Sequence, residues 1–270
     1  MKSHLERLRG WGWLPGMLLA SAVLAQAVGM EELHRLDRLP AFKSSIAIGS
    51  VSSYDRSGGN DDGFSGRYSF VRKEGEYLVL ADLKGPGVIY RVWTPTPTED
   101  ALEFLFDGEA RPRLELKFVD LFLGRHPLFP SPLAGFGAGG YYCYVPLPYE
   151  KSCVVRIRAP KVQFYQINYA RYEAGTPITT FRPDLPLGEL EQRAKALELF
   201  RGAGTDVSRF VTPPKAGVEV AASAVALAPG AAQKVFEARN GGRIVGLRVS
   251  PAGAVAGKAR DLLLRISFDG

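Results

Sequence analysis

The feature that most constrains the fold is a series of short apolar runs between Ser69 and Tyr172, separated by turns rich in Gly, Pro and charged residues. The runs are YSFVR, EYLVLADL, GVIYRVWT, LEFLFDG, LELKFVDLFLG, YYCYVPL, CVVRIRA and FYQINYARY. No helical pattern interleaves with them, which disfavours a parallel α/β sheet. Many short strands are typical of a sandwich, and a jelly roll protects its sheet edges with eight of them. We therefore expect an all-β fold.

Helical patterns flank this β region. Residues 31–40, EELHRLDRLP, place Leu33, Leu36 and Leu39 on one face of a short helix that Pro40 ends. A connecting helix is expected after Pro186, with Gly202 as its cap. The positions that follow its 3.6-residue period are Leu190, Ala194, Leu197 and Arg201.

The chain also repeats itself. Residues 85–108 and 241–270 both open with glycine and run into an apolar strand with a central arginine. Both then pass through a loop with proline into a strand that ends Phe-Asp-Gly. Such self-similarity predicts two copies of one β unit. Since the first copy continues through further strands and the second stops at Gly270, we expect the second β unit to be incomplete.

The N-terminus resembles an export signal. MKSHLERLRGWGW is basic, LPGMLLASAVLA is an apolar run, and Ala25-Gln26-Ala27 offers small residues for cleavage. The run is short for a membrane span, and this order of segments is typical of a secretory signal. We expect residues 1–27 to be removed and the protein to be secreted or periplasmic, with no membrane span afterwards. An uncleaved anchor is the alternative.

Charge and cysteine content narrow the function classes. Part of the net charge of +6 lies in the first 27 residues, and the remaining charges are scattered without a run of Lys or Arg that could track phosphates, so nucleic acid is not an expected partner. Cys143 and Cys153 flank a turn, YVPLPYEKS, and form either a disulfide or two buried thiols. Neither these cysteines nor His34 and His126 match a metal or catalytic pattern. We expect no metal site and no cofactor.

The densest polar stretch is residues 52–63, SSYDRSGGNDDG. Its glycines and aspartates are typical of a tight turn. The same residues could bind a sugar, because carboxylates accept hydrogen bonds from hydroxyls while Arg and Asn donate them. The candidate ligands of a sugar in this loop are Asp55, Arg56, Asn60, Asp61 and Asp62. Calcium is a third alternative, although the spacing does not match an EF-hand loop.

Trp93 is the aromatic candidate for the same site. It is either a core or edge residue or a platform on which a sugar ring stacks. The glycine-rich GFGAGG at 135–140 is followed by a strand rather than a helix, so we interpret it as a flexible loop and not a nucleotide fingerprint.

Three acids lie close together in FDGEARPRLELKFVD, namely Glu109, Glu115 and Asp120. A retaining glycosidase needs two carboxyl groups about 5–5.5 Å apart. Nothing in the spacing brings these acids together, so we interpret them as solvated strand residues.

Taken together, SSYDRSGGNDDG, GPGVIYRVWTPTP, FDGEARPRLELKFVDLFLG, GYYCYVPLPYEKSCVVRI and FYQINYARY resemble glycoside hydrolase family 172. The resemblance runs from about residue 30 to residue 270. It implies a double jelly roll similar to viral capsid folds, oligomers in full-length relatives, and a retaining mechanism on α-fructofuranosides or arabinofuranosides. It also places the two catalytic glutamates in the second roll, so no residue here is given a catalytic role.

These expectations divide the chain into five segments. They are a signal peptide at 1–27, a helix and linker at 28–49, a first jelly roll at 50–173, a connecting segment at 174–212 and the start of a second roll at 213–270. The expected function is that of an exported α-furanosidase-like protein whose catalytic glutamates are missing. A non-catalytic carbohydrate-binding or assembly protein of the same fold, and a non-functional gene fragment, are the alternatives.

Overall fold

The structure is a computed structural model that describes residues 28–39, 42–205, 207, 219–239, 244, 246–250, 253, 257 and 261–268. The expected signal peptide at 1–27 lies outside the described residues. Among the described residues, no helix is long and apolar enough to cross a membrane.

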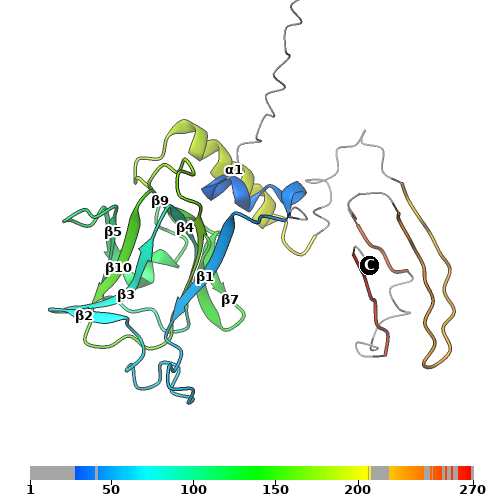
Figure 1. The fold of residues 1–270 in the computed structure, drawn as a ribbon, viewed down its shortest axis with the longest axis horizontal. Coiled ribbons are helices and arrows are strands. Elements are labelled where there is room, and N and C mark those ends of the chain that lie inside the picture. Colours follow the sequence, from blue (N-terminus) through cyan, green and yellow to red (C-terminus); the bar gives the residue numbers. More distant parts are fainter. Residues whose placement is uncertain are drawn as a thin grey trace, which may run out of the picture.

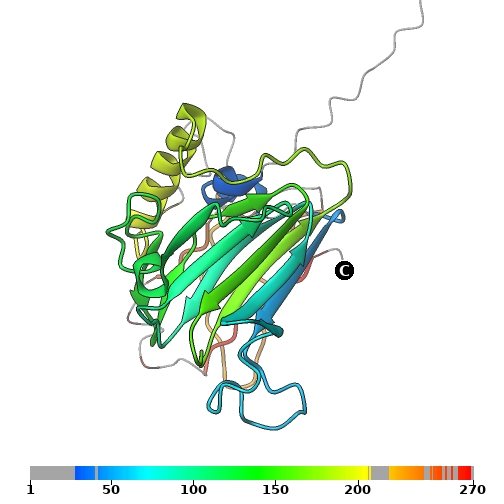
Figure 2. The ribbon, with the colours of Figure 1, turned by 90° about the vertical axis from the view of Figure 1, so that its left-hand side faces the viewer.

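Residues 46–172 form a β-sandwich of two antiparallel sheets (Figure 1). Sheet A contains β1 (Ile46–Ser52), β4 (Gly87–Thr94), β7 (Ala134–Gly137), β8 (Gly140–Cys143), β9 (Leu147–Tyr149) and β11 (Gln166–Tyr172). Sheet B contains β2 (Arg72–Glu74), β3 (Tyr77–Lys84), β5 (Ala101–Phe106), β6 (Leu114–Lys117) and β10 (Ser152–Arg158), and it faces the viewer in Figure 2.

The strand order is that of a jelly roll. Sheet A runs β1-β11-β4-β8-β7, with β9 also pairing with β4, and sheet B runs β2-β3-β10-β5-β6. Early and late strands of the chain therefore alternate within each sheet, which is the wrapping that two Greek keys produce. The all-β sandwich predicted from the sequence is confirmed.

Alternation along each strand builds the core. On β10, Cys153, Val155 and Ile157 face inward and are paired in register with Phe106, Phe104 and Leu102 of β5. In sheet A the inward row consists of Val51, Ile167, Val92, Cys143 and Ala134. These two rows pack against each other in one apolar cluster, because successive side chains of a strand point to opposite faces.

The helical elements differ from the prediction. Residues 31–39 do not form one helix but belong to two 3₁₀ segments, η1 (Gly29–Leu33) and η2 (Leu36–Arg38), and Pro40 lies outside the described residues. Of the expected apolar face, Leu33 packs against the core, whereas Leu39 is 72% exposed. Met30 instead enters the core.

The connecting helix exists as α1 (Leu187–Arg201), and the backbone N–H of Gly202 donates to the last turn as expected. Its packed side agrees with the prediction at Leu197, which packs against the core, but not at the other apolar positions. Ala196 and Leu199 are buried, whereas Ala194 is exposed and Leu190 is 39% exposed.

Several strand predictions also need correction. The apolar pattern does not predict β1, because Gly49 and the serines at both its centre and its end interrupt that pattern. LELKFVDLFLG is β6 followed by a 3₁₀ turn, η3 (Phe118–Leu121). GFGAGG is not a flexible loop but belongs to the β7–β8 hairpin, since Ala138 (φ 49°) and Gly139 (φ 79°) form a two-residue turn with both φ positive.

The two cysteines are free and buried. They are not hairpin neighbours, because β9 lies between them and they belong to different sheets. Burial raises the pKa of Cys143 to about 12 and also raises the pKa of Cys153. The alternative of two buried, unreactive thiols is therefore the one that the structure supports.

The described residues from 219 onward contain no strand and no α-helix. Within them Ser223 Oγ donates to the carbonyl of Val235, at 3.1 Å, and the backbone N–H of Ala231 donates to Ala228. Large apolar side chains in this stretch are exposed, from 40% for Val235 to 87% for Val220. The division of the chain at 213 stays a prediction.

Replacing Phe104 by Ala tests the core. Phe104 is fully buried between the sheets, so Phe104→Ala should lower the free energy of unfolding by about 3–5 kcal/mol. Phe42→Ala is the matched control, because Phe42 is 93% exposed and its loss should change stability by about 0.5 kcal/mol or less. Chemical denaturation of both variants measures the difference, and equal effects would contradict the packing described above.

Candidate functional site

The polar loop that follows β1 is organised around Asp55. The carboxylate of Asp55 accepts hydrogen bonds from the N–H and Oγ of Ser57, at 2.9 and 2.6 Å, and from the N–H of Asp61 at 3.2 Å. The Asp55 N–H donates to Asp62 Oδ1 at 2.8 Å. Asp55 is only 8% exposed. Its carboxylate therefore holds the turn together from inside.

The charge state of Asp55 reflects these contacts. Hydrogen bonds to its carboxylate, above all from the Ser57 hydroxyl, lower the pKa of Asp55 to about 2. Asp61 has a similar role at the next turn, since its carboxylate accepts from both the N–H (2.7 Å) and the Oγ of Ser65. Three of the five loop candidates, Asp55, Asp61 and Asp62, thus come together as structural acceptors.

The other two loop candidates are Arg56 and Asn60. Arg56 donates to the carbonyls of Tyr68 (2.9 Å) and Ser52 (3.4 Å) and lies over the Tyr54 ring. Asn60 is exposed, and its side chain has no hydrogen-bond partner among the described residues. Asn60 is therefore the loop side chain that is left available to a ligand.

Trp93 lies on the outer face of sheet A. Its register neighbours are Gln166 on β11 and Tyr142 on β8, and the next positions in the same row are Ser52 and Gly135. The adjacent row, which contains Val92, is the one that enters the core. Trp93 is half-buried rather than a core residue.

Two glycines allow the aromatic rings to lie against the sheet. A Cβ on Gly140 would collide with the indole of Trp93, and a Cβ on Gly135 would lie 2.9 Å from the Tyr142 hydroxyl. Neither glycine has a left-handed φ, so the requirement for glycine is close approach and not backbone conformation. Tyr142 also packs against Tyr144, with ring centroids 5.0 Å apart.

Sequence reasoning missed the polar side chains beside Trp93. Arg91 Nη1 donates to Gln166 Oε1 at 2.8 Å and to Asn168 Oδ1 at 3.0 Å, and the Arg91 guanidinium lies 5.7 Å from the centre of the Trp93 ring. The signal was present, because Arg91 and Trp93 alternate on β4 as Gln166 and Asn168 do on β11. We call Arg91, Trp93, Tyr142, Gln166 and Asn168 the Trp93 face.

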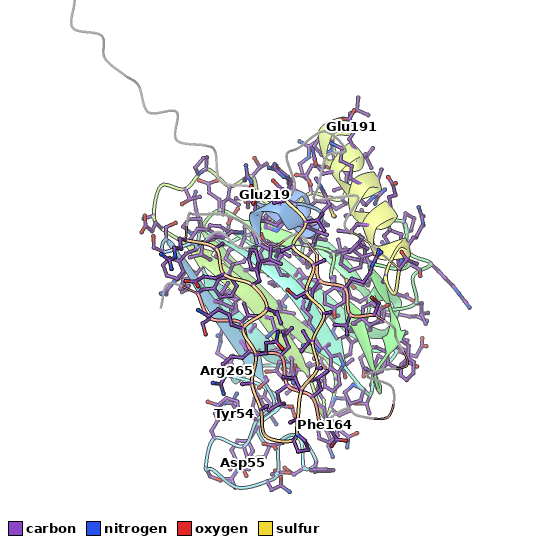
Figure 3. All side chains as sticks on the ribbon, turned by 90° about the vertical axis from the view of Figure 1, so that its right-hand side faces the viewer. Tyr54, Asp55, Phe164, Glu191, Glu219 and Arg265 are labelled. Atoms are coloured by element: carbon purple, nitrogen blue, oxygen red, sulfur yellow. The ribbon has the colours of Figure 1, made fainter. Side chains whose placement is uncertain are left out.

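The loop and the Trp93 face are linked at one end of the sandwich. Phe64 of the loop packs edge-on against Phe164, with ring centroids 4.9 Å apart, and the carbonyl of Phe164 accepts from Thr94 Oγ1 at 2.6 Å. Figure 3 shows Tyr54, Asp55 and Phe164 at this end. Trp93 is separated from Ser52 by one strand, β11, so the structure brings Trp93 near the start of the loop without direct contact to its acids.

The three acids in 109–120 lie apart from this site. Glu109 pairs with Arg113 through Oε1 and Oε2, at 3.0 and 3.2 Å from Nε. Glu115 is exposed on β6, as expected for a solvated strand residue, and Asp120 lies in η3. Glu115 is paired in register with Glu103, an acid that sequence reasoning missed.

Glu103 is only 3% exposed and is fully engaged. It accepts from the Tyr77 hydroxyl at 2.9 Å and from Arg156 Nε and Nη2 at 2.8 and 2.7 Å. Arg156 in turn stacks 4.0 Å from the centre of the Tyr77 ring. The charge of Glu103 is therefore balanced by Arg156 within sheet B.

The Trp93 face coincides neither with a metal-ligand cluster of the described residues nor with the two cavities described below. Within the described ranges no three His, Cys, Asp or Glu side chains are grouped to hold a metal ion, and His34 and His126 instead contact Gln192 and the Leu128 N–H. One cavity of about 400 Å³ is lined by Pro86, Glu150 and residues 175–179, and another of about 440 Å³ by residues 109–113. Trp93 lines neither cavity.

Two family models match this chain. Residues 44–187, more than half of the chain, match the GH172 first beta-sandwich domain, and residues 217–270 match the GH172 domain-like model. The chain belongs to the GH172 family. No curated protein matches it. The first GH172 match contains the whole sandwich, including the loop and the Trp93 face, and makes this a glycoside hydrolase-like protein.

Gly140→Ala tests how the Trp93 face is built. The added methyl collides with the indole, so the variant should displace Trp93 and lose about 1–3 kcal/mol of stability. Gly137→Ala is the control on the same hairpin, since its Cβ would meet only the Tyr142 ring at 3.5 Å. The indole N–H resonance of Trp93, identified with Trp93→Phe, should shift in the first variant and stay in place in the second.

Asp55→Asn tests the carboxylate at the centre of the loop. A carboxyl group whose pKa is lowered by folding stabilises the protein above its unfolded pKa of about 3.8, and that stabilisation is lost as the pH falls toward 2. Asp55→Asn should therefore lower the melting temperature at pH 5–7 and match the parent near pH 2. Asp120→Asn serves as a control, and a deficit in Asp55→Asn that is the same at every pH would refute the interpretation.

Proposed function

We propose that this GH172 protein binds furanosides of the fructofuranoside or arabinofuranoside class on the Trp93 face, with the loop at 52–63 as a side wall. The observation that carries the proposal is the indole of Trp93 lying against Gly140, with Arg91, Gln166 and Asn168 beside it. A flat aromatic ring and adjacent amides are the combination that binds a sugar's C–H face and its hydroxyls together.

Of the loop candidates, Asn60 is proposed to contact the sugar directly. Asp55, Asp61 and Asp62 already accept hydrogen bonds within the loop, and Arg56 binds backbone carbonyls. These four residues would act by holding the wall in place. Asp61→Ala would consequently disturb the loop itself, whereas Asn60→Ala removes a side chain that the described residues leave unbonded.

Two roles compete for the chain: hydrolysis by a retaining mechanism, and carbohydrate binding or assembly without catalysis. Double displacement needs a nucleophilic carboxylate and an acid/base carboxyl about 5–5.5 Å apart. Glu103 is bound by Arg156 and Tyr77, and Glu109 is bound by Arg113. Both carboxylates are already held in ion pairs, so we give no residue a catalytic role. Carbohydrate binding without catalysis is therefore kept as the second candidate function. Export and assembly into homo-oligomers belong to the same proposal.

Binding and turnover separate the two roles. NMR titration of the full chain with methyl α-arabinofuranoside and methyl α-fructofuranoside should shift the Trp93 indole resonance, and Trp93→Ala should weaken binding by about 1–3 kcal/mol while Phe42→Ala leaves it unchanged. Release of the aryl group from aryl α-furanosides would support hydrolysis. Binding without release would support the non-catalytic role, and neither binding nor release would overturn the proposal.

A further inference from the structure

The guanidinium of Arg91 has hydrogen-bond partners but no counter-charge. Both of its bonds run from Nη1 to neutral amide oxygens, of Gln166 and Asn168, and among the described residues no carboxylate lies within 4.0 Å of it. Arg91 is half-buried on its strand. A partly desolvated cation loses hydration, and amide oxygens restore less of that loss than a carboxylate does.

The opposite face of the sandwich shows the contrast. On sheet B, Arg72 pairs with Glu74 and Asp82 at 2.7 Å, and Arg156 pairs with the buried Glu103 at 2.7 Å. Arg72 and Arg156 on this sheet are thus neutralised by acids, whereas Arg158 bonds to the Tyr77 hydroxyl. In sheet A, Arg91 is paired in register with Asn168, which is in turn paired with Ser50. Both of these neighbours are uncharged, so neither supplies an acid.

The two amides also orient the guanidinium. They occupy Nη1 only, so Nη2 and Nε have no partner among the described residues. A guanidinium with a free Nη2–Nε edge can donate two parallel hydrogen bonds to a carboxylate or a sulfate. The same guanidinium lies 5.7 Å from the centre of the Trp93 ring, which places the anion site next to the proposed stacking surface.

We propose that the sugar bound on the Trp93 face carries an anionic group, a carboxylate or a sulfate, that pairs with Arg91. The inference rests on the proposed function, because it adds a charge requirement to the same sugar site. A neutral furanoside would stack on Trp93 and leave the cation unpaired. An anionic one would engage both, with its ring on the indole and its charged oxygens on the open edge of Arg91.

Three ligands with one ring and different substituents test this directly. They are methyl α-arabinofuranoside, its 5-O-sulfate, and the corresponding 5-carboxylate. At low salt, at least one of the two anionic ligands should bind the full chain about tenfold more tightly than the neutral one, and the difference should shrink as salt is added. Calorimetry or NMR titration measures the three dissociation constants, and comparison of the two anionic ligands distinguishes sulfate from carboxylate.

Variants at Arg91 assign the preference to that residue. Arg91→Gln should lose the tenfold preference, so that the ratio of its dissociation constants for the neutral and the anionic ligand falls to about one, whatever the change in its affinity for the neutral ligand. Arg91→Lys keeps the charge without the planar fork, so it should retain only a fraction of the preference, and it serves if Arg91→Gln does not fold. Arg125→Gln removes an equal charge from an exposed loop residue and should change nothing.

The outcomes separate this inference from the proposed function. Equal binding of neutral and anionic ligands by the parent overturns the anion requirement and leaves the sugar site standing. A preference that survives in Arg91→Gln overturns the role of Arg91. Failure of all three ligands to bind overturns the sugar site and the anion requirement together.

Discussion

The structure depends on one constraint, the alternation of side chains across strands whose inner faces must meet. Val51, Ile167, Val92 and Cys143 fill sheet A's side of the core, and each is followed or preceded by a residue that must then point outward. Gln166, Trp93 and Tyr142 are aligned across three strands for this reason alone. The register that buries the core therefore also assembles the outward row, so the Trp93 face needs no separate folding signal.

The two outer faces of the sandwich use charge differently. In sheet B, Glu103 and Arg156 form an ion pair, and Tyr77 bonds to Glu103 and stacks on Arg156. The charges of this pair are therefore balanced within the protein and need no ligand. In sheet A, Arg91 is held by amides and the aromatic rings lie over Gly140 and Gly135. Glycine weakens a strand, so any larger residue at these two positions would suit the strand better. Glycine is needed there because it leaves room for the aromatic rings to lie against the sheet. A binding surface and a structural surface thus share one sandwich.

The sequence predicts the class of fold because apolar alternation and turn residues are local signals. It predicts the positions of β3, β4, β10 and β11 well, since each has an uninterrupted apolar pattern. The sequence does not predict β1, because this strand is held by pairing with β11 along its whole length and not by an apolar pattern of its own. The same limit applies to the site. Trp93 is found by its residue type, but Arg91, Gln166 and Asn168 meet only through a pairing of strands far apart in the chain.

The loop shows why density of polar residues is a weak guide to function. Its carboxylates are the best candidate sugar ligands in the sequence, yet Asp55 accepts three hydrogen bonds from its own turn and Asp61 accepts two. An acceptor already used by the backbone has little left to offer a ligand, and displacing those bonds would unfold the turn. By contrast, Arg91 keeps an open edge because its partners are few. Unused hydrogen-bonding capacity, and not the number of polar groups, therefore distinguishes the Trp93 face from the loop beside it.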